Sequence, residues 1–236
     1  MTARDLFDAG ELDRAIEALG AELRKDPTDV QRRVFLFELL SFAGEYERAE
    51  KQLDIAGQGG REASQGALLY RSALHAEKNR QEMFESQQFP VGGAPLEPVS
   101  GTILGTAFQE FSDADPRLGA RLEVFAAGQY LWIPLEHVAS VEISSPQRLR
   151  DLLWTPAIVQ TGPGFKGLEL GQVLIPAISP LSWQYEDTDV RLGRVTEWVA
   201  LDDGTEVPVG QKLFLVDGEE VPILELRKIE INAATG

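Results

Sequence analysis

The sequence predicts an α+β fold, with antiparallel helical repeats first and a β-rich domain second. Near the N-terminus, Gly10 and Ala15 recur 34 positions later as Gly44 and Ala49. This period is typical of tetratricopeptide-like repeats, whose helix pairs stack on their neighbours to bury an apolar face. Beyond residue 118, short apolar runs bounded by turn residues replace the helical periodicity.

These patterns divide the chain into three segments. We expect a tetratricopeptide-like helical repeat domain over residues 1–88 and a Pro/Gly-rich linker and bridging segment over 89–117. We expect a β-rich domain with antiparallel hairpins and a short helix over 118–236. The boundary rests on the run from Phe89 to Ser100, which is rich in proline and glycine and has no helical periodicity.

The helical elements follow from apolar spacing and from helix breakers. Residues 3–25 predict two helices interrupted near Gly10, and the Asp-Pro-Thr-Asp sequence at 26–29 ends the second helix and starts the next. A second helix pair is expected to end at Gly57–Gly60. A third unit begins at Arg61, but Lys78, Arg80 and Met83 replace its repeat signature, so we expect a degenerate repeat that caps the array.

The second half of the chain predicts strands. Residues 121–126 and 130–135 form a predicted hairpin, and 137–143 a further extended run. Ser145-Pro146 suits the start of a short helix. Asp-Gly pairs at 203–204 and 217–218 favour tight turns, so we expect a small antiparallel meander from about 195 to 231.

Composition excludes several function classes. The 236 residues include 22 Lys and Arg against 38 Asp and Glu, a formal net charge of −16. Nucleic acid is therefore not an expected partner, because phosphate binding needs clustered cations. The acidity has two interpretations: it keeps the protein soluble, or it complements a partner with a basic surface. No stretch has the roughly 20 apolar residues that cross a bilayer, so we expect a cytoplasmic protein without membrane insertion.

Catalytic signatures are also missing. The chain has no cysteine and only two histidines, His75 and His137, so we expect no cofactor, no metal, no small-molecule substrate and no enzymatic activity. The glycine-rich run at 162–167 lacks the spacing of a phosphate-binding loop. An alternative is an enzyme that uses carboxylates of the β domain, and its candidates are Glu186, Asp187, Asp189, Glu197 and Asp202. The acidic segments 186–189 and 202–203 are instead expected to be solvated turns.

Stacked helical repeats form grooves, so the candidate site residues are partner contacts. Repeat register places these residues on the concave side: Gln31, Val34, Glu38, Phe42, Gln65, Leu68, Ser72 and His75. An equally supported alternative is that three short units form only a rigid spacer. Tryptophans in the second domain are expected mostly in the core, although tryptophan is also a favoured interface anchor; Trp132, Trp154 and Trp198 are the candidates.

Four segments in order carry a resemblance to a known family: residues 130–134, 148–157, 173–176 and 193–198. Together they resemble the ImpE/SciE family, which includes accessory proteins of bacterial type VI secretion. The resemblance implies a non-enzymatic adaptor that binds the small sheath subunit, through that subunit's N-terminal helix, and that is linked to the ClpV unfoldase in sheath recycling. A generic tetratricopeptide-like scaffold or chaperone for another cytoplasmic complex is the alternative. The groove could lie in the repeats, in the β domain or between them.

Overall fold

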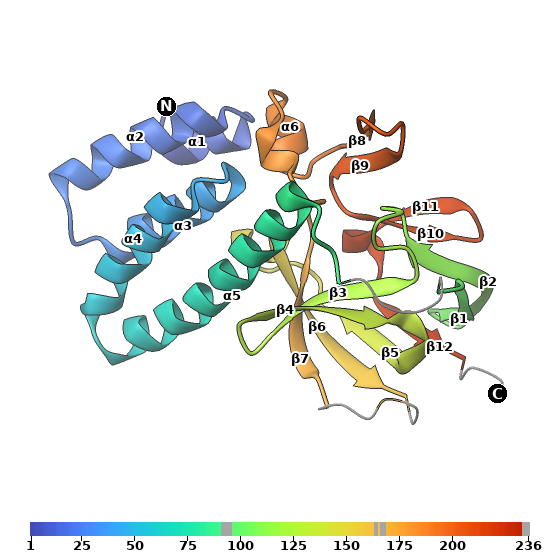
Figure 1. Ribbon diagram of the computed structural model, residues 1–236. Coiled ribbons are helices and arrows are strands. Elements are labelled where there is room, and N and C mark those ends of the chain that lie inside the picture. The colour runs from blue at the N-terminus through green and yellow to red at the C-terminus, as the bar shows by residue number, and fades with distance from the viewer. Residues whose placement is uncertain (91–95, 163–164, 166–168, 233–236) are drawn as a thin grey trace.

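The computed structural model describes residues 1–90, 96–162, 165 and 169–232. Helices occupy the N-terminal part and strands the rest, which confirms the predicted α+β class (Figure 1). The helical part consists of α1 (Ala3–Asp8), α2 (Leu12–Lys25), α3 (Val30–Phe42), α4 (Tyr46–Ala56) and α5 (Arg61–Ser86), with the 3-10 turn η1 (Gly57–Gly59) before α5.

The sequence repeat at an offset of 34 residues corresponds to two helices that end in the same way. The N–H of Glu11 donates to the carbonyl of Leu6 at 2.8 Å, and that of Glu45 donates to the carbonyl of Leu40 at 2.9 Å. The glycine before each donor has a positive φ, 80° and 71°, the left-handed conformation in which helices commonly end. A single short motif therefore turns the chain twice in the same way.

The third repeat differs from its prediction. Instead of a helix pair, residues 61–86 form one helix of 26 residues, α5. No glycine or proline occurs between Ala67 and Ser86, so nothing in the sequence interrupts the helix. The missing repeat signature at Lys78, Arg80 and Met83 marks a continuous helix rather than a degenerate pair.

The strands form one curled, fully antiparallel sheet with the order β11-β10-β2-β1-β12-β5-β6-β7-β3-β4. Its members are β1 (Val99–Ile103), β2 (Thr106–Asp113), β3 (Arg121–Ala126), β4 (Gln129–Pro134), β5 (Val138–Ile143), β6 (Trp154–Thr161), β7 (Gly171–Pro176), β10 (Leu213–Val216), β11 (Glu219–Pro222) and β12 (Lys228–Ile231). A separate two-stranded sheet contains β8 (Thr196–Ala200) and β9 (Glu206–Gly210). The described short connecting helices are η2 (Leu135–His137), η3 (Leu149–Leu152), η4 (Ser182–Gln184), α6 (Thr188–Arg191) and η5 (Ile223–Glu225).

The predicted β3–β4 hairpin and the β5 run are confirmed. The predicted C-terminal meander is wrong. The two Asp-Gly turns do close hairpins, but β8–β9 stands apart, β10 pairs with β2, and β12 lies between β1 and β5. Turn chemistry is local, whereas the choice of neighbouring strand depends on packing.

Two further segments differ from expectation. The short helix expected to begin at Ser145-Pro146 is the 3-10 turn η3, and the carboxylate of Asp151 accepts the N–H groups of Gln147 and Arg148 ahead of it. The expected linker and bridging segment over 89–117 contains β1 and β2, both hydrogen-bonded into the large sheet. The division into domains at 88 and 118 otherwise stays a prediction.

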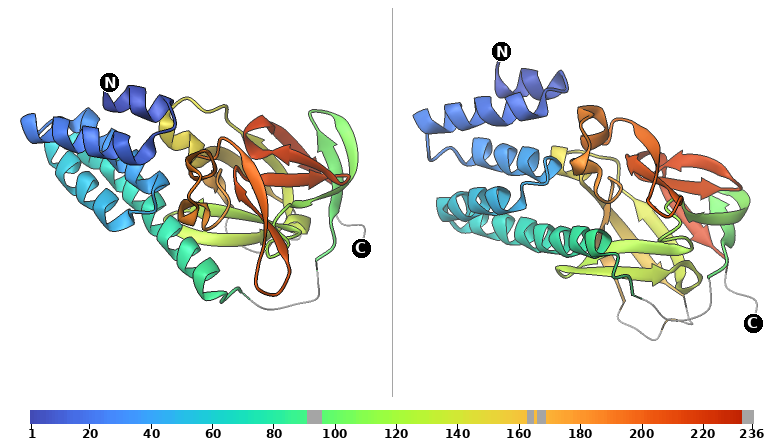
Figure 2. Two further views of the ribbon diagram at one scale, coloured as in Figure 1. Left: turned by 90° about the horizontal axis from the view of Figure 1, so that it is seen from above. Right: turned by 45° about the horizontal axis from the view of Figure 1, so that its top comes forward.

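Helices and sheet share a hydrophobic core. One buried cluster joins the repeats to Phe125, Leu153 and Trp154, and the rings of Phe37 and Trp154 lie 6.1 Å apart. A second cluster fills the interior of the curled sheet. The views in Figure 2 show the helices stacked at one side of the sheet, with α5 the helix beside β3 and β4.

Candidate functional site

A groove of about 430 Å³ lies between helix α5 and the sheet. Helix α5 supplies one wall, and β3, β6, β7, the β3–β4 turn and the segment from Ser144 to η3 supply the others. Its lining residues are Leu69, Tyr70, Ser72, Ala73, Phe125, Ala127, Gly128, Ser144, Arg150, Trp154, Pro156, Ala157, Ile158, Gln172, Val173 and Leu174. Most of these are apolar, so the groove suits an apolar partner surface.

Large apolar side chains remain exposed along this groove. Leu69 is 67% exposed and Ile158 is 42% exposed, and the neighbouring Leu68 is 62% exposed. Single exposed leucines are common on proteins, but contiguous apolar surface beside a hollow is typical of a binding site. The groove is therefore the strongest candidate for partner contact in the described part of the chain.

The groove has firm boundaries. The β3–β4 turn reaches α5, because a β-carbon added to Gly128 would lie 3.5 Å from the β-carbon of Ser72. The guanidinium carbon of Arg150 lies 5.0 Å from the ring centroid of Tyr70, a cation–π arrangement. Trp154 is buried behind the groove and donates its indole N–H to Glu77 at 2.8 Å. These contacts within the chain shape the groove, so it does not need a bound partner to form.

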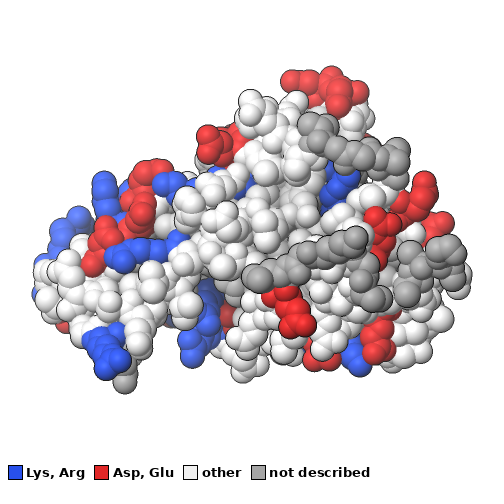
Figure 3. All heavy atoms as spheres, turned by 60° about the horizontal axis from the view of Figure 1, so that its bottom comes forward, with Lys and Arg blue, Asp and Glu red and all other residues white. Residues whose placement is uncertain are grey.

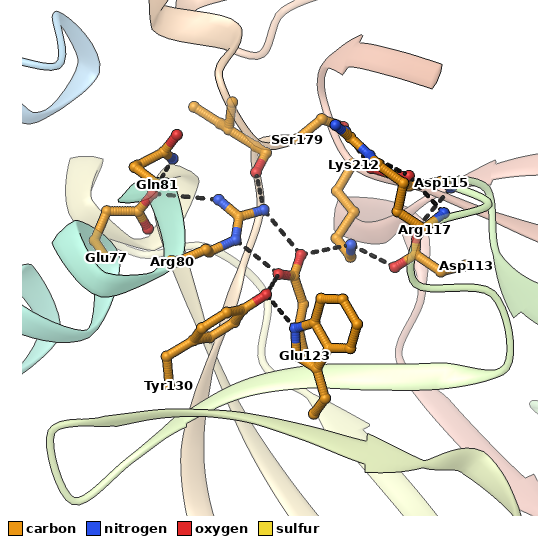
Figure 4. Close-up of polar contacts among 12 residues, drawn as sticks. Glu77, Arg80, Gln81, Asp113, Asp115, Arg117, Glu123, Tyr130, Ser179 and Lys212 are labelled. Carbon is orange, nitrogen blue, oxygen red and sulfur yellow. Dashed lines mark hydrogen bonds and ion pairs between the residues drawn. The ribbon is translucent and has the colours of Figure 1, made fainter. Parts of the chain in front are cut away.

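Beyond the groove, α5 is attached to the sheet by a buried charge network (Figure 4). The guanidinium of Arg80 donates to both carboxylate oxygens of Glu123 at 2.7 and 2.8 Å. Lys212 donates to Glu123 at 2.7 Å and lies 2.5 Å from Asp113. The hydroxyl of Tyr130 donates to Glu123 at 2.8 Å.

Electrostatics determine how this network holds the helix. Burial by itself would raise the pKa of Glu123, but the adjacent cations Arg80 and Lys212 outweigh burial and lower it. The carboxylate is thus ionised, and it is compensated by both cations only while α5, which carries Arg80, lies against β3. Separating the helix from the sheet would leave buried charges unpaired, which is strongly unfavourable. The network therefore fixes α5 as one wall of the groove.

The structure distributes the predicted concave residues over different environments. Glu38 and Phe42 are buried within the chain, Val34 is half-buried and Gln31 is exposed. On α5, Ser72 lines the groove, whereas Gln65, Leu68 and His75 are exposed. Part of the face of α3 is thus covered by the chain itself. The role of these residues in partner binding remains a prediction.

The three candidate tryptophans also lie in different environments. Trp154 lies in the shared core and contributes to the groove lining. Trp132 is half-buried and stacks on Phe89, with ring centroids 5.6 Å apart. Trp198 is 40% exposed on β8 and donates to the carboxylate of Glu220 at 3.0 Å. The three side chains do not meet at one site.

Two carboxylates of the enzyme alternative, Asp187 and Asp189, have structural contacts. Asp187 caps α6 by accepting the N–H of Asp189, and Asp189 pairs with Arg194 at 3.4 Å. Within the described residues, no group of three or more potential ligands could hold a metal ion. The glycine-rich run at 162–167 lies mostly outside the described residues. Among the helices that the structure describes, none is long and apolar enough to cross a membrane.

Sequence reasoning missed the charge network. From the sequence, Arg80 is only a departure from the repeat signature, Asp113 only the start of an expected turn over 113–117, and Lys212 is not singled out. The available signal was Glu123, a carboxylate between apolar residues of a predicted strand, because a buried charge needs a partner. That signal indicates a cation but does not identify it.

The surface charge is uneven. Figure 3 shows both signs over the helices at the left, mainly acidic side chains over the sheet at the right, and a wide uncharged area between them. A partner that contacts the middle of this face meets little charge from the protein. The acidic surroundings would favour a partner with basic groups outside its contact surface.

Comparisons with known proteins extend these observations. A family model described as "ImpE protein" matches residues 105–230. The type VI secretion system accessory component TagJ of Pseudomonas aeruginosa is 33% identical over 265 residues, covering 98% of this chain and 92% of TagJ. The crystal structure of protein VPA1032 from Vibrio parahaemolyticus has a TM-score of 0.84 at 23% identity, covering 98% of this chain and 97% of that one. This last likeness concerns the fold alone.

Proposed function

This chain belongs to the ImpE family, and from that premise we propose that it is a non-enzymatic adaptor of a type VI secretion system. It binds the small sheath subunit through that subunit's N-terminal helix and assists ClpV-dependent recycling of the sheath. Its homologue TagJ is an accessory component of that system. The groove between α5 and the sheet is the observation that supports the proposal.

A helix fits this groove for physical reasons. Amphipathic helices bind by laying apolar side chains at i, i+3, i+4 and i+7 into an apolar groove. Here Leu69 and Ile158 offer exposed apolar surface at the rim, and Phe125 and Trp154 lie behind it. The charge network holds α5 in place before binding, so little ordering is needed when the helix docks.

Calorimetric titration of the purified protein with a peptide of the sheath subunit's N-terminal helix tests the proposal. We expect saturable binding by the unmodified chain and at least a tenfold weaker affinity for Leu69→Asp, because a charge then faces the apolar partner. Leu104→Asp is the matched control, since Leu104 is 69% exposed on the β1–β2 turn and does not line the groove.

Several outcomes separate the proposal from its alternative. Absence of binding to both the peptide and the intact subunit at high micromolar concentration would overturn sheath binding and favour a scaffold for another complex. An equal loss of affinity in Leu69→Asp and Leu104→Asp would show that the groove is not the binding site. For the recycling role, a deletion strain carrying Leu69→Asp should clear contracted sheaths more slowly than one carrying Leu104→Asp, measured by fluorescence imaging of a labelled sheath.

A further inference from the structure

The groove contains one charged side chain among its described lining residues, and that side chain is positive. It belongs to Arg150 on η3, in a chain whose formal net charge is −16. We infer that the groove selects a helix with a carboxylate at the border of its apolar face, and that Arg150 receives this carboxylate. The inference rests on the proposed function, because it specifies the chemistry of the same helix.

Arg150 is held in position, but its contact with Asp151 does not use all the N–H donors of the guanidinium. Its Nε lies 3.3 Å from Asp151 Oδ1, and its guanidinium lies over the ring of Tyr70. Asp151 is itself held by the N–H groups of Gln147 and Arg148. A guanidinium has five N–H donors, and the Asp151 contact involves one nitrogen, while 27% of the side chain is exposed.

The nearby carboxyl groups offset this charge only in part. Asp151 is buried, contacts the guanidinium through Nε, and also accepts two backbone N–H groups. Glu38, a second carboxyl near Arg150, has its pKa raised to about 7 by burial, which Arg150 only partly opposes. Near neutral pH a substantial part of Glu38 is therefore protonated. The guanidinium remains a positive group at an apolar groove.

This arrangement specifies the partner. Guanidinium and carboxylate form charge-assisted hydrogen bonds, often in pairs, that are stronger and more directional than neutral ones. Apolar contacts supply most of the binding free energy, and a carboxylate beside them fixes the direction and register of the helix. On its outer side, the helix gains from basic residues that face the acidic surroundings.

The test is a double-mutant cycle. The probe is the synthetic N-terminal helix of the sheath subunit, together with peptides in which each Asp or Glu is changed singly to Asn or Gln. Arg150→Gln should weaken binding of the unmodified peptide about tenfold or more. One of the changed peptides should show the same loss with the unmodified protein, and no further loss with Arg150→Gln.

Matched variants distinguish this contact from other effects. Arg48→Gln on α4 removes an exposed cation that pairs with Glu45 outside the groove and should leave affinity unchanged. Arg150→Lys should recover part of the affinity. Thermal unfolding of each variant separates misfolding from a lost contact. If Arg150→Gln binds every peptide as tightly as the unmodified chain while Leu69→Asp does not, the carboxylate inference fails and the proposed groove stands. If the unmodified chain binds neither the peptides nor the intact sheath subunit, the proposed function itself fails.

Discussion

Arg80 and Glu123 form a two-point ion pair across the boundary between the helical repeats and the sheet. The Nε–Oε2 and Nη2–Oε1 distances are 2.7 and 2.8 Å, and the two side chains are 1% and 0% exposed. A guanidinium matches a carboxylate in this way because both groups are planar and forked. Because Arg80 lies on α5 and Glu123 on β3, the pair couples the position of the helix to the sheet.

Replacing Arg80 should destabilise the fold strongly. In Arg80→Met the buried Glu123 retains only Lys212 as a cation, so we expect the free energy of unfolding to fall by about 3–5 kcal/mol. Urea unfolding followed by circular dichroism measures the loss. The control is Arg71→Met, because Arg71 pairs with Asp54 at the surface and should contribute less than about 1 kcal/mol. Similar small losses in both variants would contradict a supporting role for the network.

The second prediction concerns the pH dependence of stability. Burial raises the pKa of Glu38 from 4.5 to about 7 in the folded chain, with Arg150 opposing the shift. Between about pH 4.5 and pH 7, Glu38 therefore stays protonated in the folded chain but is ionised in the unfolded chain. The associated stability is complete below about pH 4.5 and disappears as the pH rises to about 7, a total of about 3 kcal/mol.

Glu38→Gln isolates this effect, because the amide does not titrate. The variant should gain stability relative to the unmodified chain between pH 5 and pH 8, as measured by urea unfolding at each pH. A stability difference that does not change over this range would show that Glu38 ionises normally.

The third prediction concerns the repeated helix ending. Gly44 has a φ of 71°, and a β-carbon there would overlap the ring of Trp183. Gly44→Ala should therefore destabilise the protein by about 1–2 kcal/mol or more. Gly20→Ala is the control, since Gly20 lies inside α2 with nothing within 4 Å of the added carbon, and should stabilise the helix by up to about 1 kcal/mol. Opposite signs in thermal unfolding are the expected result.

The fourth prediction separates core from surface tryptophan. Trp154→Phe removes the hydrogen bond to Glu77 and leaves a gap in the shared core, so we expect a loss of about 1–3 kcal/mol. Trp198→Phe changes an exposed side chain and should stay within about 0.5 kcal/mol. Equal losses in chemical unfolding would mean that Trp198 supports the fold as much as Trp154 does.

Local patterns predicted the parts of the fold that depend on a few neighbouring residues. The ending at Gly10 and Gly44 was predictable because a left-handed residue favours glycine, and the β3–β4 hairpin because its apolar runs flank a short turn. The C-terminal meander was wrong, and the third repeat, expected to be degenerate, is a single helix. In those segments the local signal was a missing motif, or a turn whose strands could pair with several neighbours.

The candidate site was much less predictable. Ser72 and Trp154, both named from the sequence, line the groove, but Leu69, Ile158 and Arg150 were not recognised as groove residues. They come from a helix, a strand and a 3-10 turn that are distant along the chain. A pattern within one element shows which face is apolar, but it does not show which other element covers that face.

The sequence by itself determined the α+β class, the two repeated helix endings, the hairpin turns and the family resemblance, because each depends on residues close together or on recognisable segments. Only the tertiary structure decided that α5 meets the sheet and leaves a groove beside it. Glu123 lies 43 positions from Arg80 and 89 from Lys212. Which cation meets a buried carboxylate over such separations depends on the packing of the whole chain, and no local pattern encodes it.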